Sequence, residues 1–252
     1  MTEDGLTYPS SVIMHMKKER LDKVLVHLGL GTRKEVKKLI RQGRIQVDGK
    51  VVSDVGMHLI PEQQKLAVDG EELYYQRWLY IMLHKPAGVV SATQDLRHQT
   101  VIDLLPPMWR KNVRPVGRLD IDTEGLLLLT NDGQLSHRLR SPKYGVEKEY
   151  YVRIQGTLTE DHVKQFAKGI QLTDFKTLPA RLKILSSGTE SEALITIVEG
   201  KFHQVKRMVA AIGGRVTYLK RLRMGPLRLD KNLEPGEYRQ LSEEEILLLK
   251  QE

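Results

Sequence analysis

The chain of 252 residues contains no cysteine, few aromatic residues (6%) and no apolar run long enough to cross a membrane. Without cysteine there is no disulfide bond, no thiol nucleophile and no cysteine-bound zinc. A membrane helix needs about 18 or more apolar residues, whereas the longest apolar stretches here, such as residues 125–130, have the length of a strand. The N-terminus lacks the basic start and apolar core of a secretory signal. We therefore expect a cytoplasmic protein without a membrane partner.

Several common catalytic motifs are also missing. The sequence has no glycine-rich loop of the nucleotide-binding kinds and no G-x-S-x-G sequence around a serine nucleophile. Its 8 histidines are scattered, without a His-x-x-x-His pair, so a histidine metal site has little support. The sequence thus predicts neither a bound metal nor a cofactor.

The net charge of +8 is concentrated in two segments. Residues 17–50 carry 11 basic and 4 acidic side chains, and residues 201–228 carry 8 basic and no acidic ones. The remainder of the chain is acidic. Lys and Arg gathered in this way are typical of a protein that binds a polyanion, most often a nucleic acid. The alternative, a solvated lysine-rich surface, is less favoured when two separate segments show the pattern.

Changes of pattern along the chain divide it into four parts. We expect a disordered tail over residues 1–16, a small basic domain over 17–72, a linker over 73–78 and a larger domain over 79–250. Met14 and Met16 stand directly before the basic domain, and we hypothesise that translation begins at one of them rather than at Met1.

The basic domain is predicted to contain two helices and a hairpin. Apolar residues recur at helical spacing over residues 19–28, and Gly29 and Gly31 end that helix. Thr32 and Glu35 then form a capping box for a second helix. The sequence IQVDGKVV predicts a hairpin that turns at its Asp-Gly pair. One face of the second helix is almost entirely cationic: Arg33, Lys34, Lys37, Lys38 and Arg41.

The segment ERLDKVLVHLGLGTRKEVKKLIRQGRIQVDGKVV resembles the alpha-L RNA-binding module, first known from a ribosomal protein of the small subunit. The resemblance implies that the cationic helix face meets RNA phosphates. Such contacts position an RNA but carry little sequence information. The alternative for these five side chains is a solvated helix face.

The larger domain mixes strands and helices without a regular βαβ order. Strands are predicted at residues 78–83, 125–130, 148–154, 182–185, 193–198 and 215–222, and helices at 132–140, 159–168 and 203–212. Irregular alternation of this kind favours an α+β fold with a mixed or antiparallel sheet.

Two carboxylates precede the apolar strand of this domain in the sequence GRLDIDTEGLLLLTNDG. A carboxylate beside a buried strand needs a partner to remain ionised. Cations are plentiful in the distant segment GKFHQVKRM, but chemistry alone makes Asp120 and Asp122 equal candidates for a catalytic role. The alternative is a turn held by hydrogen bonds of the Asp, Thr and Gly residues.

The sequence GRLDIDTEGLLLLTNDG resembles the central motif of the pseudouridine synthases. Three further blocks match in the same order: HKPAGVVSAT, SPKYGVEKEYYV and EGKFHQVKRM. Together with the alpha-L module, the resemblance covers about 230 residues. It implies a catalytic domain with a mixed, mainly antiparallel sheet flanked by helices, and an isomerisation of uridine that needs no cofactor.

The resemblance assigns a role to individual residues. Asp120 is implied as the catalytic aspartate, which acts on the uridine at the ribose C1′ or through a glycal route. Tyr150 is implied to stack on the base and to help remove the C5 proton, and Lys206 to pair with the aspartate. Arg118 is implied to help extrude the uridine, since the base must leave its helix to be turned. Further substrate contacts are expected from Leu194, which would line the pocket behind the base, and from His203, Gln204 and Arg207.

The substrate is suggested by HQVKRM. Synthases that act on large-subunit RNA usually have Asn-Arg at the His203–Gln204 position or beside it, and this sequence keeps the small-subunit pattern. The resemblance therefore implies a uridine of small-subunit (16S) ribosomal RNA. We expect this RNA to be met within an assembly intermediate, with naked RNA and the finished subunit as alternatives, and we expect a monomeric enzyme. Two alternatives remain open: the same reaction on large-subunit (23S) RNA, and a non-catalytic RNA-binding assembly factor that keeps the fold.

Overall fold

The computed structural model describes residues 17–251, and these residues divide into two compact units between Arg77 and Trp78. The expected tail of residues 1–16 and the hypothesis on Met14 and Met16 lie outside the described residues. In the part of the chain that is described, no helix is long and apolar enough to cross a membrane.

The first unit contains the two predicted helices, α1 (Leu21–His27) and α2 (Arg33–Arg41). The predicted capping box is present at the start of α2, where Glu35 accepts a hydrogen bond from the backbone N–H of Thr32 at 2.7 Å. A small sheet has the strand order β3-β2-β5-β6, and β1 pairs with β4. The strands are β1 (Glu19–Arg20), β2 (Ile45–Val47), β3 (Lys50–Val51), β4 (His58–Leu59), β5 (Leu66–Val68) and β6 (Glu71–Leu73).

The hairpin between β2 and β3 turns where the sequence predicts it. Asp48 and Gly49 both have positive φ angles, 50° and 75°, as a two-residue hairpin turn of type I′ requires. The apolar faces of both helices pack with this sheet to form the hydrophobic core of the first unit, in which Leu25, Val36 and Ile40 are fully buried. The opposite face of α2 is thereby left to its cations.

The second unit is built on one mixed sheet with the strand order β11-β12-β10-β13-β9-β7-β15, to which β8 and β14 add short pairs. All named pairs of strands are antiparallel except β9 with β13, which confirms the predicted α+β fold with a mainly antiparallel sheet. The strands are β7 (Tyr80–Lys85), β8 (Arg114–Pro115), β9 (Glu124–Thr130), β10 (Lys148–Gln155), β11 (Arg181–Ser186), β12 (Glu190–Ile197), β13 (Arg215–Met224), β14 (Leu227–Arg228) and β15 (Tyr238–Gln240).

The unbroken apolar run of β9 is explained by burial on both faces of the sheet. Leu127 and Leu129 enter one core, whereas Leu126 and Leu128 enter a second core on the other face. Side chains alternate between the faces of a strand, so a strand covered on both sides needs apolar residues at every position.

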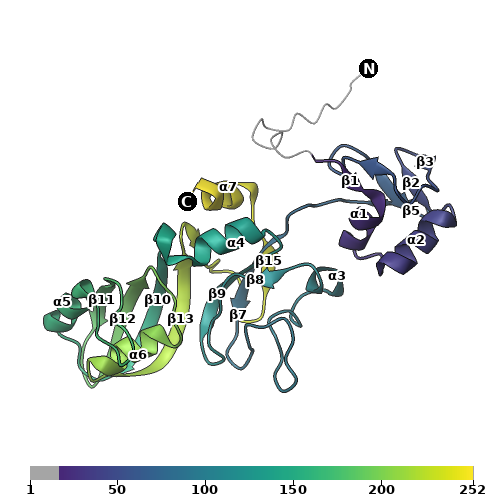
Figure 1. Ribbon diagram of the computed structural model, residues 1–252. Coiled ribbons are helices and arrows are strands. Elements are labelled where there is room, and N and C mark those ends of the chain that lie inside the picture. Colours follow the sequence, from purple (N-terminus) through teal and green to yellow (C-terminus); the bar gives the residue numbers. More distant parts are fainter. Residues whose placement is uncertain (1–16, 252) are drawn as a thin grey trace. The chain divides into compact units, whose positions relative to one another are not determined.

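Helices cover both faces of this sheet. One core receives side chains from α4 (Gly133–Arg140) and α7 (Glu243–Gln251). The two helices lie near each other (Figure 1), and Arg138 of α4 donates a hydrogen bond of 2.6 Å to the carbonyl of Leu249 in α7. The other core receives side chains from α5 (Glu160–Lys168) and α6 (Gln204–Ala211). Two further short elements are α3 (Pro107–Arg110) and a 3₁₀ turn (Pro142–Tyr144).

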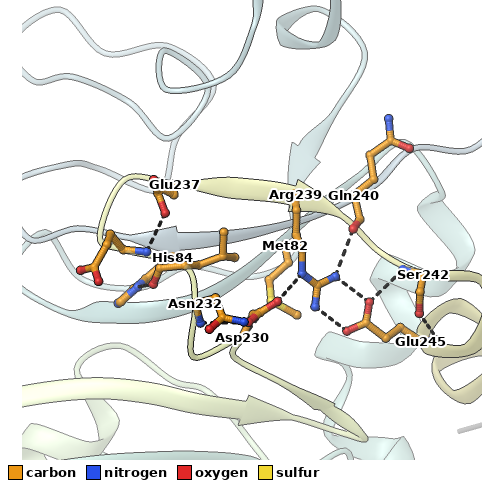
Figure 2. A network of polar contacts seen from close by, with 11 residues as sticks. Met82, His84, Asp230, Asn232, Glu237, Arg239, Gln240, Ser242 and Glu245 are labelled. Carbon is orange, nitrogen blue, oxygen red and sulfur yellow. Dashed lines mark hydrogen bonds and ion pairs between the residues drawn. The ribbon is translucent and has the colours of Figure 1, made fainter.

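Arg239 of the edge strand β15 ties the end of the chain to the sheet (Figure 2). Its Nε donates to Asp230 at 2.7 Å, and its two terminal nitrogens donate to the carboxylate of Glu245 in α7, each at 2.8 Å. The hydrogen bonds from Arg239 hold the pKa of Glu245 below its ordinary value. Near the C-terminal end of β7, the backbone N–H of His84 donates to the carbonyl of Glu237 at 2.9 Å. These contacts fix β7, the strand that ends at the candidate site.

Strands β9 and β13 form the one parallel pair between named strands in residues 17–251, with Glu124 beside Lys220 and Gly125 beside Arg221. The backbones approach so closely that a Cβ atom added to Gly125 would lie 2.3 Å from the carbonyl oxygen of Arg221. The φ angle of Gly125 is +106°, which side chains other than glycine rarely adopt. Glycine is therefore required where the loop that carries the two aspartates enters the sheet.

Candidate active site

A cleft brings together three segments that are distant in the sequence: the loop before β9, the strand β10 and the start of α6. Asp120, Tyr150 and Lys206 all line it, one from each segment. Its apolar wall is formed by Ile197, Val205 and Leu219. The three residues that the sequence resemblance implies as catalytic therefore share one site.

Lys206 forms ion pairs with both aspartates of the loop. Its Nζ lies 3.1 Å from Oδ2 of Asp120 and 2.5 Å from Oδ1 of Asp122. Burial alone would lower the pKa of Lys206, but hydrogen bonds and charges from the two carboxylates outweigh burial and raise it. Burial likewise opposes the ionised form of Asp122, yet the contact with Lys206 lowers its pKa. The site thus holds a fixed cation against two carboxylates.

The two aspartates differ in exposure. The Asp120 side chain is 26% exposed and lines the cleft, whereas that of Asp122 is 66% exposed and does not line it. Asp120 is therefore the carboxylate that can reach a bound substrate, which agrees with the resemblance. Asp122, which by its chemistry alone was an equal candidate, contacts Lys206 from the solvent side.

Lys85, the last residue of β7, is fully buried beneath the aspartate loop. Its ammonium group donates to the backbone carbonyls of Thr123 at 2.8 Å, of Ile121 at 3.4 Å and of the adjacent proline at 2.9 Å. Burial lowers the pKa of Lys85 to about 8, although both aspartate charges favour the protonated form. This side chain supports the loop from below, and its role was not predicted from the sequence.

Ser91 provides a second support for the same loop. Its buried hydroxyl donates to the carbonyl of Leu119 at 2.9 Å and accepts from the N–H of Leu119 at 3.0 Å. On the other side of Asp120, the N–H of Gly88 donates to the carbonyl of Ile121 at 2.7 Å. The backbone on both sides of Asp120 is thus held by residues of the block HKPAGVVSAT, which begins at the end of β7.

Tyr150 lies in the wall of the cleft and is 7% exposed. Its neighbour Tyr151 points to the other face of the sheet, where its ring meets that of Tyr218 at 6.1 Å. The alternation of the two tyrosines is the one that the strand pattern predicts. The Tyr150 ring is placed to contact a base that enters the cleft.

Leu194 does not line the cleft, contrary to expectation. In the register of β10 and β12 it stands opposite Tyr151, whereas Ile195 stands opposite Tyr150. Residues opposite each other in an antiparallel pair share a face. Leu194 therefore lies on the face away from the substrate, and Ile197 occupies the apolar wall in its place.

The other expected substrate contacts divide into two groups. Arg118 and His203 line the cleft, and the Arg118 side chain is exposed at its edge. Arg207 does not line the cleft: it forms an ion pair with Asp174. Gln204 lines the cleft but is 4% exposed, and both ends of its amide are engaged within the protein. We assign Gln204 and Arg207 to the support of the site.

In the first unit, Lys34, Lys38 and Arg41 lie on the side of α2 away from its buried residues Val36 and Ile40, whereas Arg33 and Lys37 flank the buried side. Lys37 is half-buried and the other four, Arg33, Lys34, Lys38 and Arg41, are exposed. Phosphate contacts require this kind of accessible, clustered charge.

Among the residues described by the structure, no group of three or more His, Asp or Glu side chains is arranged to hold a metal ion. The chemistry that the cleft itself offers is a carboxylate nucleophile or base, a fixed cation, an aromatic ring and an apolar wall. Such a set suits a reaction on a flat, uncharged base attached to a sugar.

Comparison with known proteins agrees with this geometry. Residues 79–211 match the RNA pseudouridylate synthase family, and residues 19–71 match the S4 domain, which is the alpha-L module. A protein of Bacillus subtilis (strain 168) named "Uncharacterized RNA pseudouridine synthase YtzG" is 48% identical over 233 residues, which cover 91% of this chain and 98% of the relative.

Other relatives have a more specific name. The "Ribosomal small subunit pseudouridine synthase A" of Vibrio cholerae (serotype O1) is 45% identical over 90% of this chain and 97% of the relative, and that of Escherichia coli (strain K12) is 45% identical over 90% and 98%. A crystal structure of a pseudouridylate synthase matches with a TM-score of 0.65 and 37% identity, covering 91% of this chain and 99% of that one. The chain belongs to the RNA pseudouridylate synthase family.

Proposed function

We propose that this protein converts one uridine of small-subunit (16S) ribosomal RNA into pseudouridine. The observation that carries the proposal is the ion pair of 3.1 Å between Asp120 and Lys206, in a cleft that Tyr150 also lines. The relatives at 45% identity named for the small ribosomal subunit support this choice of RNA. The small-subunit pattern HQVKRM supports it independently.

The reaction is an isomerisation in which atoms and electrons balance within the nucleoside. The bond from the ribose C1′ to N1 breaks and a bond from C1′ to C5 forms, while C5 loses a proton and N1 gains one. Asp120 starts the reaction, either by attack on C1′ or by the glycal route. Lys206 holds its carboxylate in place, and Tyr150 stacks on the base and assists removal of the C5 proton. The apolar wall keeps water from the separated base.

Binding requires that the uridine leaves its helix before the chemistry starts. Arg118 is exposed at the edge of the cleft and supports the gap that the base leaves in the RNA. The cationic face of α2 binds phosphates elsewhere on the same RNA. The functional division is a binding domain over residues 17–72 and a catalytic domain over residues 79–250.

The physiological substrate is an assembly intermediate of the small subunit in the cytoplasm, and the enzyme acts as a monomer. A base that must be extruded is more accessible before the RNA is enclosed by ribosomal proteins. Modification of gradient-purified intermediates, compared with naked RNA and finished subunits, tests this part of the proposal.

The decisive experiment is pseudouridine mapping of ribosomal RNA from cells with and without the protein, with Asp120→Ala as the rescue control. We expect one small-subunit site to disappear and only the unmodified protein to restore it. Loss of a large-subunit site would keep the reaction and overturn the substrate. If no site changed, or if Asp120→Ala restored it, the RNA-binding assembly factor would replace the enzyme as the better account.

A further inference from the structure

Phe202 exposes an aromatic ring at the edge of the active site. The residue is 69% exposed, although an aromatic side chain of this size is ordinarily stabilised by burial. Its ring is stacked on the imidazole of His203, with centroids 3.8 Å apart and planes 18° apart. The two rings lie face to face as one stack, which we call the 202–203 platform.

The backbone holds this platform in an unusual conformation. His203 has a φ angle of 49°, in the left-handed region that few residues other than glycine adopt. Such strain persists only where neighbouring contacts determine the conformation, and it is frequent at functional sites. Here the buried carboxylate of Glu199 accepts from Gln204 at 2.7 Å and from the backbone of Leu178 at 2.8 Å. The side-chain oxygen of Gln204 in turn accepts from the N–H of Lys201 at 2.9 Å. The turn before α6 is therefore fixed, and the platform with it.

The platform stands directly beside the reacting group. Nε2 of His203 lies 3.7 Å from Oδ1 of Asp120, and His203 lines the cleft. Phe202 provides the other ring of the stack, and it does not line the cleft. A uridine bound at Asp120 therefore has this platform next to it.

The surroundings of the platform are cationic. Lys201 and Lys206 flank it in the sequence, and Arg118 and Lys201 line the same cleft. An exposed aromatic ring among cations, continuous with a site for a nucleotide, is the arrangement by which proteins bind single-stranded nucleic acid. Lys206 is paired with Asp120 and Asp122, and Lys201 lies 3.8 Å from Glu199, whereas Arg118 is exposed at the edge of the cleft.

We propose that the 202–203 platform stacks on the base of a nucleotide adjacent to the target uridine. The proposal rests on the proposed function, because it assumes that the uridine of an RNA occupies the cleft. Extrusion of the target takes away a stacking partner from its neighbour, and Phe202 replaces that partner. The enzyme then selects uridines whose neighbour is unpaired or easily unpaired, which is a rule about RNA structure rather than about base sequence.

The test is a double-mutant cycle between the protein and the RNA. The proteins are the unmodified enzyme, Phe202→Ala and Phe202→Trp, each also carrying Asp120→Asn so that binding is measured without turnover. The RNA is a short fragment around the modified site, either intact or with an abasic nucleotide on one side of the target. On intact RNA, we expect Phe202→Ala to raise Kd about 5- to 150-fold and Phe202→Trp to change it by less than about threefold.

The abasic fragments decide whether the lost contact is stacking. If the platform holds the neighbouring base, the protein with Phe202→Ala and the protein that keeps Phe202 should bind one of the two abasic fragments equally well. An undiminished effect of Phe202→Ala on both abasic fragments, or no effect on intact RNA, would overturn the proposal. Leu247→Ala, an exposed apolar truncation on α7, is the matched control and should leave Kd unchanged.

The outcome for the platform is separable from the outcome for the proposed function. Product formation by the unmodified enzyme shows whether small-subunit RNA, large-subunit RNA or neither is the substrate, and the cycle is run on the RNA that is modified. If no RNA is modified, the proposed function fails. The Kd values are then measured with a single-stranded RNA that contains uridine. Equal Kd values for Phe202→Ala and the unmodified protein would overturn the proposal for the platform.

Discussion

Lys206 contacts Asp122 more closely than it contacts Asp120, at 2.5 Å against 3.1 Å. The Lys206 ammonium group is therefore positioned by Asp122 and lies within ion-pair distance of Asp120. We expect Lys206→Met to lower kcat by about 100-fold or more, the usual effect of removing a preorganised charge from an active site. Asp122→Asn should lower kcat by less than about tenfold, because the amide oxygen still accepts from Lys206. Single-turnover kinetics measures both, and equal losses would show that Asp122 has more than a holding role.

The same contacts predict how the pair responds to pH. The pKa of Asp122 is lowered from 3.8 and that of Lys206 is raised from 10.5, so both are charged between these values. The stability that the pair contributes should be constant from about pH 5 to pH 10. It is lost as pH falls through the lowered pKa of Asp122, or as pH rises through the raised pKa of Lys206. Because Asp122 is largely exposed, the contribution should not exceed about 1 kcal/mol. Denaturant unfolding of Lys206→Met and of the unmodified protein across this range measures it, and a decline between pH 6 and 8 would contradict the assignment.

For Lys85, we expect the free energy of unfolding to increase, rather than decrease, as the pH rises. Its pKa is lowered from 10.5 to about 8, so between these values the unfolded chain binds a proton that the folded chain has released. The free energy of unfolding should therefore rise as pH increases from 8 to 10.5. Lys148, a second buried lysine with a pKa of about 8, contributes in the same way. Lys85→Met should lose part of this rise and also lower kcat, because the loop of Asp120 loses its support. An unchanged pH dependence in this variant would show that Lys85 titrates normally.

The cationic face of α2 can be tested through the salt dependence of RNA affinity. Lys37→Gln combined with Lys38→Gln should weaken binding and make the slope of log K against log salt shallower, by about 0.7–0.9 for each lost phosphate contact. The matched control is Lys164→Gln combined with Lys168→Gln, which removes the same charge from α5. Titrations at several salt concentrations measure the slopes. Equal slopes in the two double variants would mean that α2 makes no specific phosphate contact.

Gly125 is expected to tolerate no side chain. In Gly125→Ala, the added carbon would meet the backbone of Arg221 at 2.3 Å, which requires β9 and β13 to separate. We expect a loss of at least about 3 kcal/mol in the free energy of unfolding. Gly133→Ala, at the first residue of α4, is the control: nothing lies within 4 Å of its Cβ, and alanine favours the helix. This control should be neutral or slightly stabilising in the same denaturant titration.

The sequence was sufficient for features whose cause is local. The capping box of Thr32 and Glu35, the turn at Asp48 and Gly49 and the α+β alternation of elements follow from short-range patterns, and the structure confirms them. The candidate residues Asp120, Tyr150 and Lys206 came from the family resemblance, because their spacing alone does not bring them together. The structure places all three in one cleft.

The features that the sequence did not yield depend on distant contacts. A lysine in the turn HKPAG is ordinarily a surface residue, and nothing local indicates that Lys85 binds carbonyls more than 30 residues away. Leu194 was misplaced because β12 is apolar on both faces over Ala193–Ile195, so this pattern does not determine which side of the strand faces the substrate. Likewise, Asp122 resembles any aspartate of a turn until the position of Lys206 is known.

The parallel contact of β9 with β13 separates two antiparallel groups of strands. Asp120 leads into the first group, whereas Tyr150 and Lys206 belong with the second. Each group can keep its own hydrogen bonds while the boundary between them opens, and such partial opening requires less free energy than global unfolding. The enzyme should then become inactive at denaturant concentrations that leave its circular dichroism spectrum unchanged, so that a preparation with full secondary structure is no guarantee of an assembled active site.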